Sequence, residues 1–532
     1  MPGGIKIGLW TRRLVNAGRV EPARRAAGAR AIAPGRRAGL DWRAEGDADG
    51  RVGGIRGALG AAEAAAARQR ALPDSGRGAG RVNAPHPLLA RMRGDVPGEL
   101  WPPVFGHERA SLAALLFALD RTQWSTPEEI AAGQARQFAL LVRHFARHSS
   151  RFRARMAAAG LDPRVLDLAR VAELPPLARR EVQAAGSALY CPTPPAHAPV
   201  RIGQTSGSTG EPVRIAKGRM CQLMWLAMSV RWHLWQEPDP MARRAAVRVL
   251  VERDAVEHKD WGGAMGALFE TGPLLVLNGG LDLADQAARL AAFAPRSLLV
   301  YPSTLAGLID AMPPLPSLAR IRTFGETLSP EARAAAEAHF GVEVHDCYSS
   351  EEVGYIAVEC PGSGLYHLMA ESLVVEVVDD DGRPCRPGEA GRVLVTDLHN
   401  FAMPMIRYEI GDRAVPGGPC PCGRGLPTLA RVLGRERNLL LKPDGTTAWP
   451  VTGYRRYREI APVVQFQFVQ TGREDIEVRL VVGTALDAAQ EAALTKLIHA
   501  SLGYPFRLTF AYFEGRLPRG ANGKFEEFVR AF

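Results

Sequence analysis

A run of small hydroxyl residues and glycines, "TSGSTGEP" from Thr205 to Pro212, has the composition of an anion-binding loop. Glycines let the backbone turn tightly, and the free N–H groups of such a turn form a concavity that binds anions. The hydroxyl groups add neutral donors that can follow phosphate oxygens as they move. The six candidate phosphate-binding residues are Thr205, Ser206, Gly207, Ser208, Thr209 and Gly210.

The alternative for this run is a flexible linker. Pro212 and the strand-like "VRI" that follows it argue against a linker. The pattern G-x-x-x-x-G-K-[ST] does not occur here, so the run is not a Walker A loop. We therefore expect a phosphate grip without a fixed positive charge.

Further candidate residues stand alone and each has an ordinary structural alternative. Asp412 follows Gly411, as turn residues often do. Glu351 and Glu352 could stabilise a helix start, and Lys524, near the end of the chain, could be a surface lysine. Their chemistry depends on what the fold brings beside them.

Three cysteines and a histidine form a separate hypothesis. Cys360 and His367 make a Cys-x6-His pair, and Cys420 and Cys422 make a Cys-x-Cys pair. Three thiolates and an imidazole suit a structural Zn²⁺. The alternative is reduced cysteines in a β-rich region, because about 50 residues separate the pairs, unlike compact zinc motifs.

The surrounding pattern predicts the elements that position these residues. Between 245 and 345, short apolar runs alternate with helical stretches, which indicates an α/β sheet with parallel neighbours. Residues 373–397 form two β runs around a turn-rich segment, which indicates a small antiparallel unit. Thr126 is the expected N-cap of a helix that begins with Glu128 and Glu129 in its first turn.

The chain is long enough for several domains. We expect a disordered basic Gly/Ala/Arg-rich extension over 1–95, a large N-terminal domain over 96–433 and a small mobile α+β domain over 434–532. Residues 1–90 hold 16 Lys and Arg against 7 Asp and Glu, leaving 50 against 49 in the rest. The folded body is therefore near neutral and is not expected to bind nucleic acid.

The basic extension has three alternative functions: an arm that binds RNA or an anionic membrane, an unstructured addition, or an organelle transit peptide. The interspersed Asp and Glu argue against the transit peptide. The sequence shows no run of 18 apolar residues and no secretory leader, and its seven scattered cysteines do not suggest a disulfide framework. We expect a cytoplasmic protein without a membrane span.

Taken together, these motifs resemble the adenylate-forming superfamily, most closely its phenylacetate–CoA ligase and capsular-polysaccharide adenylyltransferase-like branch. The resemblance covers roughly Trp101 to Lys524. Besides the hydroxyl-rich run, it rests on "FGETLS" (Phe324 to Ser329), "DCYSSEEVGYIAVEC" (Asp346 to Cys360), "MIRYEIGD" (Met405 to Asp412), "LGRERNLLLKPDG" (Leu433 to Gly445) and "LPRGANGK" ending in Lys524.

The resemblance implies a role for each motif. Thr205–Gly210 would hold the β- and γ-phosphates of ATP. Glu352 would hold Mg²⁺, Asp412 would accept hydrogen bonds from both ribose hydroxyls, and Lys524 would stabilise charge developing on the α-phosphate. The residues implied near the adenosine are Gly325, Glu326 and Thr327 around the adenine, Tyr348 against the ring and Arg435 at the ribose or phosphate.

The chain departs from the family pattern at three places. Ser349 and Glu351 stand where the family has Gly and Ser/Thr, so that Glu351 competes with Glu352 as the metal ligand. Val213 replaces a lysine after the loop proline, and Lys217 is a candidate substitute. Arg437 occupies the usual position of the hinge aspartate.

The implied activity is an AMP-forming ligase that activates a carboxylic acid, expected to be aryl or arylacetic, and transfers it to CoA. The apolar, Trp-rich stretch Cys221 to Trp235 is expected to be mainly core, with one or two residues facing the acid, and Tyr301 and Ser303 could join that wall. The alternatives are transfer to a carrier-protein thiol or an amine, and a non-catalytic nucleotide-binding homologue.

Overall fold

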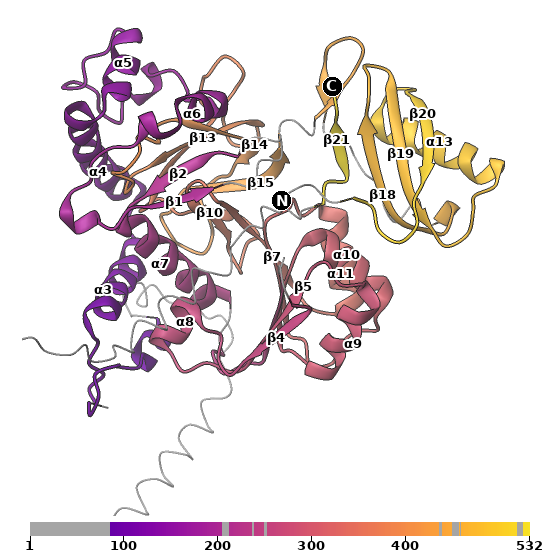
Figure 1. Cartoon of the computed structure of the whole chain (residues 1–532), viewed down its shortest axis with the longest axis horizontal. Coiled ribbons are helices and arrows are strands. Elements are labelled where there is room, and N and C mark those ends of the chain that lie inside the picture. The colour runs from indigo at the N-terminus through magenta and orange to yellow at the C-terminus, as the bar shows by residue number, and fades with distance from the viewer. Residues whose placement is uncertain are drawn as a thin grey trace, which may run out of the picture. The chain divides into compact units, whose positions relative to one another are not determined.

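The computed structural model describes residues 86–99, 101–204, 212–236, 239–248, 253–435, 439–448, 457, 459–518 and 525–532 (Figure 1). These residues all belong to one compact unit of the chain. Within the described part, no helix combines the length and the apolar character needed to cross a membrane.

A six-stranded sheet confirms the α/β pattern expected between 245 and 345. In spatial order its strands are β4 (Ala255–His258), β5 (Leu274–Asn278), β3 (Arg244–Arg248), β6 (Ser297–Val300), β7 (Arg320–Thr323) and β8 (Val344–His345). All neighbours are parallel except β4 with β5. The central strands are buried because helices cover both faces.

The two layers of helices pack on opposite faces of this sheet. Leu298, Val300 and Ile321 lie in one core cluster, and Ala246 and Leu299 lie in another. The first layer consists of α9 (Leu283–Phe293), α10 (Pro302–Ala311) and α11 (Pro330–Phe340). The second consists of α3 (His107–Thr122), α7 (Arg219–Gln236) and α8 (Gly263–Leu268).

A seven-stranded antiparallel sheet follows in the sequence. In spatial order its strands are β12 (Leu373–Val378), β13 (Gly391–Asp397), β14 (Tyr408–Pro416), β15 (Thr428–Arg435), β11 (Tyr366–Leu368), β10 (Gly354–Glu359) and β9 (Cys347–Ser350). The expected antiparallel unit is confirmed, since Leu373 pairs with Asp397. A separate hairpin joins β1 (Arg201–Gln204) to β2 (Arg214–Lys217), with Gln204 opposite Arg214.

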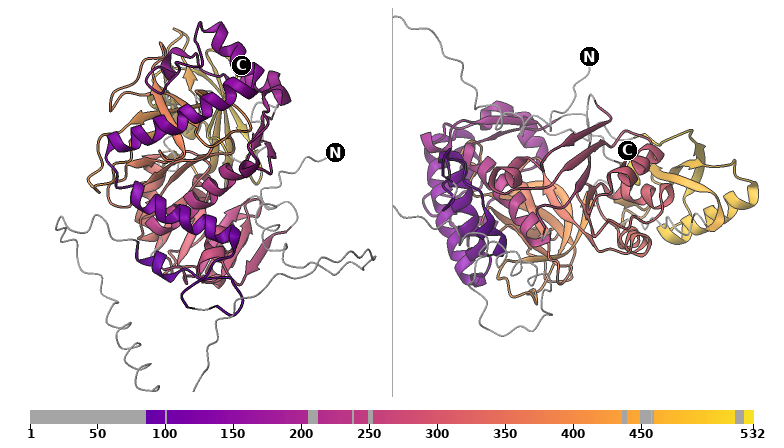
Figure 2. Two further views of the ribbon diagram at one scale, coloured as in Figure 1. Left: turned by 90° about the vertical axis from the view of Figure 1, so that its left-hand side faces the viewer. Right: turned by 90° about the horizontal axis from the view of Figure 1, so that it is seen from below.

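The remaining helices of the N-terminal part lie before β1 in the chain. In Figure 2 the helices nearest the N-terminal end of the described residues are drawn in indigo. The remaining helices are α4 (Pro127–His148), α5 (Ser150–Ala158), α6 (Arg179–Ala185) and the 3-10 turns η1 (Pro87–Arg91), η2 (Val171–Glu173), η3 (Gly186–Leu189) and η4 (Pro195–His197). Thr126 caps α4 as expected, because its hydroxyl accepts from Glu129 N–H while the Glu129 carboxylate accepts from Thr126 N–H.

Residues before the expected start of the large domain also join its core. Leu88, Leu89 and Met92 are buried in the same cluster as α3 and α7. The packed body therefore includes residues on the N-terminal side of Val96, while the division into 1–95, 96–433 and 434–532 stays a prediction.

The C-terminal part has the α+β composition expected from the sequence. Its elements are β16 (Leu440–Leu441), β17 (Thr447–Ala448), β18 (Val463–Gln470), β19 (Asp475–Val482), α13 (Ala488–Leu502), β20 (Arg507–Tyr512) and β21 (Phe528–Arg530). The sheet order is β20-β19-β18-β21. Leu494, Ile498 and Leu502 place one face of α13 in the core formed with this sheet.

A buried ion pair ties α7 to the N-terminal helices. Arg231 donates to both carboxylate oxygens of Glu371 (2.8 and 3.0 Å) and to the Leu119 carbonyl (2.7 Å). Thr122 also donates to Glu371 (2.8 Å). The Arg231 side chain is 3% exposed and that of Glu371 is 13% exposed. Because both charges are largely removed from water, each needs the other as its counter-charge.

We predict that Glu371→Gln lowers the free energy of unfolding by about 3–5 kcal/mol, because it leaves a buried guanidinium without its counter-charge. Urea unfolding followed by tryptophan fluorescence would measure the loss. Asp381→Asn is the matched control, since the Arg383–Asp381 pair is 74% and 68% exposed. It should cost less than about 1 kcal/mol, and equal losses in both variants would contradict the prediction.

Candidate functional site

Asp412 is the centre of a buried polar cluster between β9, β14 and β15. Tyr348 on β9 donates its hydroxyl to one Asp412 carboxylate oxygen (2.7 Å), and Arg435 Nε lies 3.0 Å from the other. Asp412 and Arg435 are directly paired residues of β14 and β15. Arg435 also donates to the Ile410 carbonyl (2.7 Å). The sequence-predicted Tyr348, Asp412 and Arg435 therefore lie together.

The electrostatics of this cluster follow from its burial. Burial raises the pKa of the Tyr348 phenol, and the neighbouring Asp412 carboxylate raises it further. The pKa of the Arg435 guanidinium is also raised, chiefly by Asp412. Tyr348 is thus held neutral as a hydrogen-bond donor and Arg435 is held charged. Asp412, 7% exposed, remains compensated by both.

Glu352 continues the cluster on its other side. Its carboxylate is 3% exposed and accepts from Arg179 Nη1 at the start of α6 (2.8 Å). The same Nη1 lies 3.4 Å from the Tyr408 hydroxyl. Burial raises the pKa of Tyr408, and the Glu352 charge adds to this effect. Arg179 belongs to the site, although no sequence motif pointed to it.

The structure separates the two adjacent glutamates. Glu351 is exposed, and its backbone carbonyl accepts a hydrogen bond from the Lys217 ammonium. Glu352 is buried beside Arg179, so it is the glutamate that faces the cluster. Lys217 also lies over the Trp225 ring, 5.4 Å from its centroid, and Val213 is fully buried.

The segment Gly325–Glu326–Thr327 approaches the same place from the end of β7. Gly325 has φ +77°, a backbone conformation that favours glycine. A Cβ at Gly434 would lie 2.4 Å from Thr327 Oγ1, so Thr327 packs directly against the residue before Arg435. Glu326 accepts from the Ser303 backbone N–H (3.0 Å).

The six residues of the predicted phosphate loop lie outside the described residues, as do Lys524 and Arg437. The described strands β1 and β2 lead into and out of that loop. The roles expected for Thr205–Gly210 and Lys524 therefore stay predictions.

A small enclosed cavity of about 10 Å³ lies beside the Glu352 turn. Its walls come mainly from α7, β10 and the end of β13, and the lining residues are Lys217, Cys221, Met224, Trp225, Met228, Val353, Gly354, Tyr355, Ser372 and Asp397. Trp225 and Tyr355 meet edge to face, with ring centroids 5.6 Å apart. Tyr301, expected as a possible wall residue, packs on Phe324 (4.6 Å between centroids), and its role at the acid stays a prediction.

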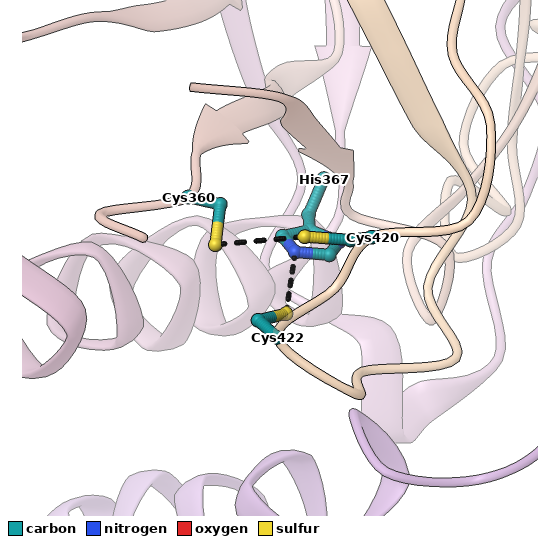
Figure 3. Close-up of side chains that lie close together, drawn as sticks. All are labelled: Cys360, His367, Cys420 and Cys422. Carbon is teal, nitrogen blue, oxygen red and sulfur yellow. Dashed lines mark hydrogen bonds between the residues drawn. The ribbon is translucent and has the colours of Figure 1, made fainter. Parts of the chain in front are cut away.

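Cys360, His367, Cys420 and Cys422 converge at the other end of β10, as Figure 3 shows. Their four donor atoms lie within 4.8 Å of one another. The Cys420 and Cys360 sulfurs are 3.7 Å apart, and His367 Nε2 is 3.2 Å from the Cys422 sulfur. A tetrahedral metal with bonds of about 2.3 Å would have sulfur–sulfur edges of about 3.8 Å, so the set fits one Zn²⁺.

The protonation of these donors also fits a metal. His367 Nδ1 lies 3.4 Å from the Leu426 carbonyl, which can only accept. A proton on Nδ1 would leave the Nε2 lone pair facing the Cys422 sulfur, as a metal ligand requires. The pKa of the Cys422 thiol is lowered to about 6, chiefly by a hydrogen bond with Cys360, whose own pKa is raised by this bond. Cys422 is thus readily a thiolate.

Comparison with known proteins agrees with this geometry. No family model matches the chain. The chain is 25% identical over 342 residues to a phenylacetate–coenzyme A ligase of Aromatoleum evansii, covering 61% of this chain and 74% of that relative. It is 25% identical over 265 residues to a phenylacetate–coenzyme A ligase of Pseudomonas putida, covering 46% of this chain and 56% of that relative.

A solved structure of a 2-hydroxyisobutyryl-CoA ligase, in the postadenylation state with 2-HIB-AMP, matches the chain with a TM-score of 0.61. The sequence identity is 17%, and the match covers 78% of this chain and 90% of that chain. At this identity the match shows the fold. The chain therefore has the fold of that coenzyme A ligase, and its sequence is similar to the phenylacetate–coenzyme A ligases of Aromatoleum evansii and Pseudomonas putida.

Proposed function

We propose that this chain is an AMP-forming ligase that converts a carboxylic acid to its coenzyme A thioester. The observation that carries the proposal is the buried cluster in which Asp412, Tyr348 and Arg435 lie together beside Glu352. In the first step a carboxylate oxygen attacks the α-phosphorus of ATP and pyrophosphate leaves. In the second the thiolate attacks the acyl carbon and AMP leaves.

Each part of the cluster is proposed to contact a different part of the nucleotide. Asp412 presents two oxygens that can accept from the ribose hydroxyls, and Arg435 holds that carboxylate in place. The Gly325–Thr327 segment lines the adenine side, with Tyr348 as an aromatic neighbour. Thr205–Gly210 would hold the phosphates, and Lys524 would approach the reacting carboxylate from the C-terminal part.

Mg²⁺ fits at Glu352 because a buried carboxylate is a hard oxygen ligand, and Mg²⁺ is commonly held by one carboxylate together with substrate phosphates. The metal would offset the charge of the triphosphate during pyrophosphate departure. Glu351 lacks this position since its side chain faces solvent.

The acid is proposed to be aryl or arylacetic. This rests on the similarity to phenylacetate–coenzyme A ligases, since the cavity beside Glu352, of about 10 Å³, has room for about one water molecule and not for an aromatic ring. The acceptor proposed is CoA, and a carrier-protein thiol or an amine is the alternative. All seven cysteines lie in the described part and are free, which supports the reducing cytoplasm as its location.

We also propose that Cys360, His367, Cys420 and Cys422 hold a structural Zn²⁺. Four protein ligands close the coordination shell, which is typical of structural rather than catalytic zinc. The metal would join the end of β10 to the loop before β15 and would not take part in ligation.

ATP–pyrophosphate exchange across aryl, arylacetic, fatty and amino acids tests the ligase proposal. Exchange that depends on one acid class, and falls at least about 100-fold in Lys524→Ala, is the expected result. AMP release that requires CoA would then identify the acceptor. Nucleotide binding without exchange for any acid would favour the non-catalytic homologue and overturn the proposal.

We predict that Glu352→Gln lowers kcat/KM for Mg·ATP by about 100-fold, because it removes the charged metal ligand. Glu351→Gln is the matched control, since it makes the same chemical change one residue away on an exposed side chain. It should stay within about twofold of the parent. A larger loss in Glu351→Gln than in Glu352→Gln would reverse the assignment of the metal ligand.

We predict that the purified protein contains about one zinc ion per chain. Inductively coupled plasma mass spectrometry would measure this content. Cys422→Ser should lose the metal and lower Tm by about 5 °C or more, because ligand loss removes a link between distant strands. Cys385→Ser changes a thiol outside the cluster and is the control. It should keep the zinc and the Tm of the parent. Zinc-free protein with the Tm of a zinc-supplemented sample would contradict the zinc site.

A further inference from the structure

Arg179 has no role in the proposed reaction so far, yet within the described part of the chain its guanidinium forms an ion pair with Glu352. Arg179 Nη1 is 2.8 Å from the Glu352 carboxylate, and the Arg179 side chain is 23% exposed. We propose that Arg179 binds the β- and γ-phosphates of ATP and stabilises the departing pyrophosphate. This inference rests on the proposed adenylation.

Arg179 donates a hydrogen bond to the carboxylate that is expected to bind the metal. Glu352 would hold the metal together with phosphate oxygens of the nucleotide, and those oxygens would lie near the guanidinium that contacts the same carboxylate. A guanidinium presents several N–H groups in one plane, which suits two oxygens of one phosphate group.

The charges of the neighbouring residues favour Arg179 for this role. Val213 stands where a loop lysine would be expected, and it is fully buried. Lys217 is directed to the Glu351 carbonyl and the Trp225 ring. Arg435 is paired with Asp412 on the ribose side. Of these described residues, Arg179 is therefore the one whose cationic group lies beside the proposed metal ligand, where the phosphates would bind.

Exchange of partners follows from the burial of Glu352. Without nucleotide, Arg179 neutralises a carboxylate that is 3% exposed. When Mg²⁺ takes over the carboxylate, the Glu352–Arg179 ion pair is lost, and an anion beside the guanidinium would replace the lost attraction. Phosphate supplies it, so Mg²⁺ and pyrophosphate should each strengthen the binding of the other through this pair.

The backbone around Arg179 holds it in place for this exchange. Leu177 N–H donates to the Arg407 carbonyl (2.8 Å), and Glu409 N–H donates to the Leu177 carbonyl (3.0 Å). The segment before α6 is thus pinned to β14 on both sides of Tyr408. A side chain that starts from a fixed backbone loses less freedom when it binds a ligand.

The test compares Arg179→Gln, Arg179→Lys and Arg180→Gln, the last being the exposed neighbour on the same helix. Calorimetry with Mg·pyrophosphate gives Kd without turnover, and exchange kinetics give KM for pyrophosphate and for the acid. We expect Arg179→Gln to weaken pyrophosphate binding about 10- to 100-fold, with the KM for the acid within about twofold. Arg179→Lys should recover part of the affinity, and Arg180→Gln should match the parent.

Pyrophosphate affinity in Arg179→Gln equal to that in Arg180→Gln would overturn the inference, and so would an equal loss for pyrophosphate and acid. If Arg179→Gln does not fold, Arg179→Lys decides: a selective loss of pyrophosphate affinity supports the inference, and none overturns it. A parent protein that shows no acid-dependent exchange would instead defeat the proposed function, so the two failures are distinguishable.

Discussion

Two buried carboxylates in one site are the constraint on which the rest of the arrangement depends. Asp412 and Glu352 are 7% and 3% exposed, and a buried carboxylate is costly unless it is paired. Each has its own arginine, Arg435 at 3.0 Å and Arg179 at 2.8 Å. The Asp412–Arg435 pair therefore adds an ion pair to the backbone pairing of β14 with β15. The Glu352–Arg179 pair joins the turn before β10 to the start of α6. Under the proposed function a metal at Glu352 would take the place of Arg179, while Asp412 would keep Arg435 as it accepts from the ribose.

The same two elements reach both the site and the cysteine cluster. Strand β10 begins at Gly354, next to the Glu352 turn, and its end is followed by Cys360. Helix α7 lines the cavity with Trp225 and meets His367 through Trp235, whose ring lies 5.6 Å from the imidazole. Arg424, in the loop with Cys422, packs over Trp235 at 4.4 Å. The cluster is thus placed to fix the far ends of the elements that line the cavity beside Glu352.

The parts of the fold that the sequence predicted correctly were those written in local patterns. The Thr126 cap and the antiparallel run 373–397 each depend on residues close in sequence. The cysteine set was suggested by ligand type, although its halves are distant, and pairing of β11 with β15 brings them together. Arg179 gave no such signal, because its partner lies 173 residues away and a single arginine is usually a surface residue.

The choice between Glu351 and Glu352 shows why a site can resist prediction at the level of one residue. The two side chains are chemically identical and adjacent in a turn between β9 and β10, so neither composition nor strand alternation separates them. The turn is fixed from outside. Lys217 on β2 holds the Glu351 carbonyl, while Gly354, with φ +91°, lies so close to α7 that a Cβ there would be 3.1 Å from the Trp225 ring. Contacts from two distant elements therefore direct Glu352 inward, and they exist only once the chain has folded.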